Sequence, residues 1–133
     1  MRDDANIVIP RRKSLDSYPS IQRFYENLGN QIWNQLTGHE LDMWFGARIM
    51  QRDMCSHFVN YDIKYGKKWE SFFVPVMAAL FDGYKIQSID VDYIHPSAQT
   101  FFEEGNLEYD IKRLEQFFVI VNALIKYHRE RFQ

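Results

Sequence analysis

Residues 106–132 read NLEYDIKRLEQFFVIVNALIKYHRERF, and this stretch predicts the longest helix of the chain. Mostly apolar side chains recur along it at alternating spacings of four and three residues, which is typical of a heptad seam. The seam consists of Leu107, Ile111, Leu114, Phe118, Val121, Ile125, His128 and Phe132. Asn106 is a favourable cap, with acidic residues near the beginning and basic residues near the end. Because apolar residues also fill the other sides of its middle turns, we expect neighbours to cover this C-terminal helix on several faces.

The preceding chain predicts three more main helices, over residues 18–36, 39–65 and 69–81, and a short helix from Pro96 to about residue 104. Residues 84–94 differ, because apolar and acidic residues alternate there with the period of a strand. The apolar triplet Ile7–Ile9 is a second strand-like piece, so a two-stranded ribbon within or between chains is plausible. The predicted fold is therefore all-α: a bundle of four main helices and one short helix around a central C-terminal helix, with a possible short β-ribbon near residues 84–94.

The length of 133 residues indicates one domain, and we expect a flexible N-terminal tail over residues 1–16 and a single helical domain over residues 17–133. The basic run at residues 11–13 is interpreted as a solvated part of that tail. The net charge of −2 does not favour nucleic acid or a membrane as partner. A single cysteine, Cys55, excludes an internal disulfide and suits a reducing compartment. With no apolar segment long enough to span a bilayer, the expectation is a soluble, cytoplasmic protein.

Charge is distributed unevenly along the chain. Residues 71–110 carry one basic residue, Lys85, against seven acidic ones. Tyrosines lie among these acids, and a ring with a polar tip is a common anchor in interfaces. We therefore predict a surface that binds a protein partner with a basic surface, and it comprises Tyr84, Asp90, Asp92, Tyr93, Glu103, Glu104, Glu108 and Tyr109. The alternative is that the negative stretch only keeps the protein soluble.

Residues for catalysis or metal binding do not form a convincing group. The four histidines are far apart and none is in a spacing that places two ligands on one helix face. Asp90 and Asp92 share a strand face, but no glycine-rich phosphate loop accompanies them. Cys55 is interpreted as a packing residue. We therefore expect no catalysis, no metal and no cofactor.

Arg52 and His57 are separated by four residues. This spacing resembles the R-x4-6-H signature of HEPN-family ribonucleases, which are helical bundles of about this size. The resemblance implies that Arg52 would steady the phosphate and that His57 would assist metal-independent cleavage at the 2′-hydroxyl. A HEPN-like ribonuclease is therefore the alternative function.

The function we favour from the sequence is a small protein-binding regulatory protein, of inhibitor, immunity or adaptor type, without catalysis. A structural subunit of an oligomer is a further alternative. The expected helix over residues 39–65 carries apolar residues on two sides, and the strand needs a partner. We therefore expect a homodimer.

Overall fold

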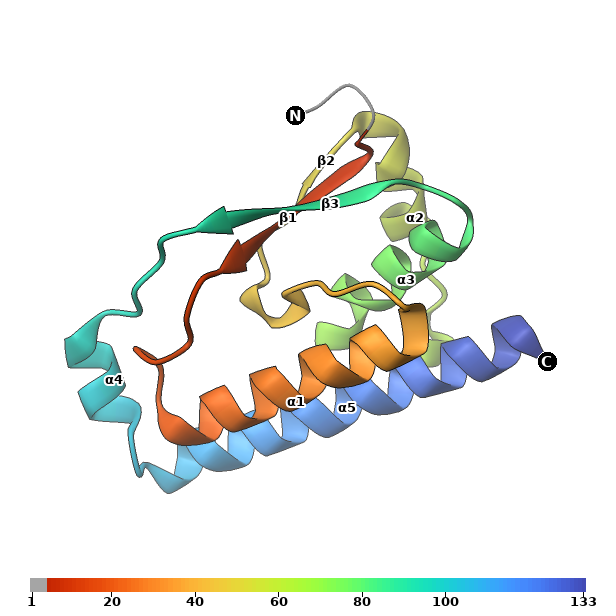
Figure 1. Ribbon diagram of the computed structural model, residues 1–133. Coiled ribbons are helices and arrows are strands. Elements are labelled where there is room, and N and C mark those ends of the chain that lie inside the picture. Colours follow the sequence, from red (N-terminus) through yellow and green to blue (C-terminus); the bar gives the residue numbers. More distant parts are fainter. Residues whose placement is uncertain (1–4) are drawn as a thin grey trace.

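The computed structural model describes residues 5–133 and shows a helix-dominated mixed α/β fold. A small sheet lies on one side of the molecule, the helices α1 (Ser20–Thr37) and α5 (Leu107–Phe132) lie side by side on the opposite side, and short helices fill the space between them (Figure 1). The two long helices run in the same direction, as Figure 1 shows. The prediction of an all-α bundle is therefore wrong, because it omitted a three-stranded sheet.

The sheet has the order β2-β1-β3, with β1 (Ile7–Arg12) in the centre. β1 is antiparallel to β2 (Ile49–Met50) and parallel to β3 (Ile86–Val91), with Ile7 opposite Ile86 and Arg12 opposite Val91. The expected pairing of Ile7–Ile9 with residues 84–94 is found within one chain. The expectation of a flexible tail fails for residues 7–12, because burial of Ile7 and Ile9 and pairing on both edges hold this strand in the core. Residues 1–4 of that predicted tail lie outside the described residues.

Most predicted helices are found close to their expected positions. These are α1, α3 (Val74–Phe81), α4 (Ser97–Glu103) and α5. The Asn106 side chain accepts a hydrogen bond from the Glu108 backbone N–H and caps α5 as predicted. Pro75 lies in the first turn of α3, where its missing N–H costs little.

The expected helix over residues 39–65 is not continuous. Its residues form the 3₁₀ turns η1 (Met43–Phe45), η2 (Arg52–Met54) and η3 (Ile63–Tyr65), the strand β2 and the five-residue helix α2 (Cys55–Val59). Gly46 has a left-handed backbone (φ 89°), which ends η1 before a longer helix can form. Met43 and Met54 are both fully buried, so the apolar residues that suggested a helical stripe reach the core from a folded-back loop instead. A further 3₁₀ turn, η4 (Trp69–Phe72), precedes α3.

The predicted seam of α5 does not face the core. The buried residues of α5 are Phe117, Ile120, Val121, Ala123 and Leu124, and only Val121 among them belongs to the seam. Phe118, near the middle of the seam, is 53% exposed, and Leu107, at its beginning, is 71% exposed. Because the middle turns are apolar on nearly all sides, the sequence pattern does not determine which side is buried.

Leu124→Ala is expected to lower the free energy of unfolding by about 3 kcal/mol, because it leaves a cavity in the core cluster around the fully buried Leu124. Val59→Ala is the matched control, since Val59 is 81% exposed and its change should cost less than about 0.5 kcal/mol. Urea unfolding of both variants measures the difference. Equal destabilisation would show that the α5 face containing Leu124 is not central.

Candidate functional site

The predicted acidic surface is partly neutralised within the chain. Asp90 Oδ1 accepts a hydrogen bond of 2.8 Å from Arg11 Nε, and Asp92 Oδ1 lies 3.0 Å from Lys13 Nζ. The hydrogen bond from Arg11, aided by its charge, lowers the pKa of Asp90. The basic run and the two aspartates face each other because β1 and β3 are parallel neighbours with Arg11 opposite Asp90. Arg11 and Lys13 have the same spacing of two residues as Asp90 and Asp92, and this matching spacing was the signal in the sequence for the pairing.

Two of the other predicted acids also have partners inside the protein. Glu103 is buried, accepts a hydrogen bond of 2.9 Å from Gln99 Nε2 and lies 3.8 Å from His95 Nε2. Glu104 accepts hydrogen bonds from the backbone N–H and the hydroxyl of Ser20, and thereby links α4 to the beginning of α1. Glu108 remains exposed on α5 and has no ion pair with any residue in the described range 5–133.

The three predicted tyrosines contact the protein itself. Tyr84 packs against the core, with the ring of His57 edge-on at 5.0 Å. The ring of Tyr93 lies 5.2 Å from Phe45, and that of Tyr109 lies 5.9 Å from Phe102. The eight predicted residues are therefore distributed over β3, α4 and the adjoining loops and α5, and most of them already have structural contacts.

The structure does not join Arg52 and His57 into a site. Arg52 is exposed in η2, and its side chain makes no hydrogen bond or ion pair with the residues that the structure describes. His57 in α2 instead has its Nε2 3.1 Å from Asp82 Oδ2, and Asp82 Oδ1 accepts a hydrogen bond of 2.7 Å from Arg131. The helical bundle that the HEPN resemblance implied is also not the fold observed here.

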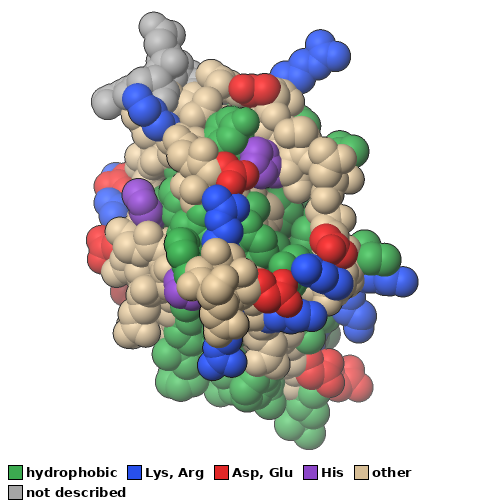
Figure 2. Space-filling model, turned by 90° about the vertical axis from the view of Figure 1, so that its right-hand side faces the viewer, with side chains coloured by type: hydrophobic (Ala, Val, Ile, Leu, Met, Phe, Trp, Pro, Cys, Tyr) green, Lys and Arg blue, Asp and Glu red, His purple; other side chains and the backbone are tan. Residues whose placement is uncertain are grey.

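An exposed apolar surface, which we call the outer face, lies on α1 and α5. It consists of Ile21, Phe24, Leu107, Ile111 and Phe118, of which Phe24 is 60% exposed. Figure 2 shows hydrophobic side chains gathered along the lower edge of the molecule, the side on which α1 and α5 lie in Figure 1. Three of the five residues belong to the heptad seam, so this part of the seam is exposed and does not pack into the core.

Ring contacts connect the two halves of the outer face. Phe24 contacts Tyr25 at a centroid distance of 5.2 Å, Tyr25 contacts Phe117 at 5.1 Å, and Phe117 contacts Phe118 at 5.8 Å. This row crosses from α1 to α5 and holds the exposed rings of Phe24 and Phe118 on a common support. Because Phe117 is buried, the outer face rests on the core and not on a loop.

Charges follow a simple order beside the outer face. Glu108, Glu115, Asn122 and Arg129 are spaced by seven residues, so they lie along one side of α5, and all four are exposed. The charge along this row changes from acidic at the beginning of α5 to basic near its end. A helix that packs against α5 therefore meets opposite charges at its two ends.

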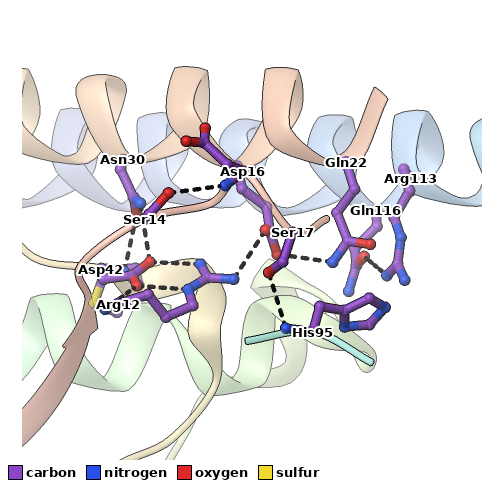
Figure 3. A network of polar contacts seen from close by, with 12 residues as sticks. Arg12, Ser14, Asp16, Ser17, Gln22, Asn30, Asp42, His95, Arg113 and Gln116 are labelled. Carbon is purple, nitrogen blue, oxygen red and sulfur yellow. Dashed lines mark hydrogen bonds and ion pairs between the residues drawn. The ribbon is translucent and has the colours of Figure 1, made fainter. Parts of the chain in front are cut away.

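A buried polar network holds β1, α1 and the segment before η1 together (Figure 3). Arg12 donates through Nε and Nη2 to both carboxylate oxygens of Asp42, each at 2.7 Å, and through Nη1 to Glu26 Oε2 at 3.1 Å. Asn30 donates to Asp42 Oδ1 at 3.1 Å and accepts from the Met43 backbone N–H at 2.9 Å. Arg12 was expected in a solvated basic run, and that prediction is wrong because Arg12 is buried in this network.

The network changes the pKa values of its two carboxyl groups. Burial alone would raise the pKa of Asp42, but the hydrogen bonds and charge of Arg12 outweigh burial and lower it. Burial dominates at Glu26 and raises its pKa, although the charge of Arg12 opposes this. The Arg12 guanidinium also lies over the rings of Tyr18 and Phe45, at 4.9 and 5.0 Å from their centroids. Since each charge has a close partner, we interpret this network as structural.

Other classes of site receive little support. The described residues contain no group of three or more histidine, cysteine or acidic side chains that is placed to hold a metal. Within residues 5–133, neither α5 nor any other helix has both the length and the apolar character needed to cross a bilayer. Comparisons with protein-family models, with curated proteins and with solved structures find no match to this chain.

Proposed function

We propose that this chain is a regulatory protein of inhibitor or adaptor type that binds a protein partner through the outer face of α1 and α5. The observation that carries the proposal is the exposure of five large apolar side chains on two helices that pack side by side. Contiguous apolar surface of this kind is typical of protein interaction sites. The binding surface thus differs from the acidic strand face expected from the sequence, and of those acids only Glu108 contributes to it.

The partner surface that fits is an apolar helix with a charge at each end. At about 1.5 Å per residue, the 26 residues of α5 extend for roughly 39 Å, enough length for an interface of ordinary size. The partner helix should be basic where it meets Glu108, and acidic where it meets Arg129. As part of this proposal the protein acts in the cytoplasm, where its free, exposed Cys55 would stay reduced.

A second copy of the chain meets these requirements if its α5 runs antiparallel to the first. A two-fold axis near Phe118 then brings Glu108 of each copy beside Arg129 of the other, and Glu115 beside Asn122. We therefore expect the isolated protein to be a homodimer through the outer face, and a physiological partner with a similar helix would replace the second copy.

Light scattering should give the mass of two 16.0 kDa chains at micromolar concentration. Glu108→Arg places like charges together twice across the two-fold axis, so it should weaken the dimer by about tenfold or more. Adding Arg129→Glu restores opposite charges and should restore the affinity. A wild-type mass of one chain, or a double variant no tighter than Glu108→Arg alone, would contradict the proposed arrangement.

A further inference from the structure

A pocket of about 380 Å³ lies between α1, η1, η4 and α5, on a different side of α5 from the seam. Its apolar walls are aromatic rings, and they belong to Tyr18, Trp44, Phe45, Trp69, Phe72 and Phe73. Trp44 packs edge-on against Phe73 at a centroid distance of 4.7 Å, which fixes the orientation of both rings. A pocket of this volume with several rings suits a small planar molecule.

Arg48 brings to this pocket a positive charge that no direct ion pair with a described residue neutralises, although the charge of Asp42 acts on it from a distance. Its guanidinium donates only to backbone carbonyls, with the shortest bond of 2.9 Å to Met43 O, and no carboxylate in the described part of the chain forms an ion pair with it. Burial lowers the pKa of Arg48 to about 10. The group is therefore charged at neutral pH at a cost to the protein, and a bound anion would offset that cost.

Arg113 lines the same pocket from α5. It donates to Gln116 Oε1 at 3.4 Å, one helical turn away, and forms no ion pair with a residue in the range 5–133. Two guanidinium groups without ion-pair partners among the described residues therefore line one cavity, which the mutually paired Arg12 and Glu26 also line. Guanidinium groups are well suited to phosphate, because several N–H groups donate to its oxygens at once.

The side-chain oxygen of Gln22 is a hydrogen-bond acceptor that receives no hydrogen bond from the described residues. Its Nε2 donates to Glu26 Oε1 at 3.3 Å, while its Oε1 is buried and receives no hydrogen bond from the described residues. Gln22 is only 6% exposed, so an unpaired oxygen there calls for a missing donor. Figure 3 shows Gln22 of α1 close to Arg113 and Gln116 of α5 at one end of the polar network.

We propose that this pocket binds a mononucleotide, in addition to the protein-binding role of the outer face. The base packs among the aromatic rings and donates an N–H to Gln22 Oε1, and the phosphate binds Arg48 and Arg113. A nucleotide combines a planar ring, an N–H donor and an anion, which are the three features that the lining residues require. The volume of about 380 Å³ suits one nucleotide.

Titration calorimetry with the four ribonucleoside 5′-monophosphates, the four nucleosides and phenyl phosphate tests this. At least one nucleotide should bind, about tenfold or more tightly than its nucleoside, and phenyl phosphate should bind less tightly than that nucleotide because it lacks the N–H donor. Arg113→Gln and Arg48→Gln should each weaken nucleotide binding by about tenfold. Arg52→Gln is the matched control, since Arg52 is exposed and lies outside the pocket lining.

Several results would overturn the proposal. They are the absence of binding by all four nucleotides at millimolar concentration, equal binding of nucleotide and nucleoside, equal binding of phenyl phosphate, or unchanged affinity in Arg113→Gln. Because Arg113 is a half-buried helix residue whose side chain hydrogen-bonds only to Gln116 among the described residues, its variant should keep the fold. The test therefore remains decisive if Arg48→Gln, which loses three bonds to carbonyls, does not fold.

Discussion

Arg12→Met is expected to lower the free energy of unfolding by about 3–5 kcal/mol, because it leaves the buried carboxylates of Asp42 and Glu26 without their counter-charge. The Arg12 side chain is 1% exposed, and those of Asp42 and Glu26 are nearly as buried. The substitution keeps most of the apolar stem of the side chain, so the lost charge and hydrogen bonds account for the change. Urea unfolding at neutral pH measures the effect.

The neighbouring residue provides the control for this prediction. Arg11 also forms an ion pair with an aspartate, Asp90, but both side chains are about half exposed. Arg11→Met should therefore destabilise the protein far less than Arg12→Met does. If the two variants lose similar stability, the buried network does not hold β1 to α1 as described.

The pH dependence distinguishes lost charge from lost packing. In the wild type the pKa of Asp42 is lower in the folded than in the unfolded chain, where it has its ordinary value of 3.8. Ionised Asp42 therefore stabilises the fold above pH 3.8, and this stabilisation is lost as the pH falls through the lowered pKa of the folded chain. Glu26 has a raised pKa in the folded chain, so its contribution to the free energy of unfolding is favourable at acidic pH. This contribution is lost as the pH rises through the raised pKa. Without Arg12 both carboxyl groups should have raised pKa values, so the deficit of Arg12→Met should be largest at neutral pH and shrink below about pH 4. A deficit independent of pH would indicate a packing effect.

Phe118→Asp is expected to weaken self-association by a hundredfold or more while leaving the chain folded. Phe118 is half exposed in one chain but lies near the proposed two-fold axis, so the variant would bring two carboxylates together in an apolar interface. Val59→Asp adds the same charge at another exposed apolar position, on α2, and should remain dimeric. Sedimentation of the three proteins over a range of concentrations measures the dissociation constants. Equal weakening by both variants would remove the outer face as the binding surface.

The parts of the fold that were predictable are those with long periodic patterns. α1 and α5 follow from apolar spacings that extend over several turns and from clear end signals such as Asn106 and Gly38. β1 was not predictable as a central strand because it is short, combines an apolar triplet with charged residues and depends on pairing with segments far along the chain. The helical spacing of apolar residues over residues 39–65 was misleading. Met43 and Met54 are both buried in the core, and they can reach it without belonging to one continuous helix.

The candidate sites were predictable only in part. The seam of α5 was visible in the sequence, but its exposure depends on which apolar side packs against the body, and Phe117 and Leu124 provide that packing instead. The acidic segment was visible too, yet its neutralisation by Arg11 and Lys13 depends on the parallel register of β1 and β3. The pocket unites residues from α1, η1, η4 and α5, which no local pattern links.

Cysteine cross-linking tests most directly whether the outer face binds protein. In a Cys55→Ser background, which removes the one native thiol, Phe118→Cys places a thiol of each copy near the two-fold axis. Mild oxidation should convert most of this protein to a disulfide-linked dimer, while Val59→Cys in the same background should remain largely monomeric on a non-reducing gel. Failure of the residue 118 thiols to cross-link, or equally efficient cross-linking at residue 59, would contradict the assignment of the outer face as the protein-binding surface.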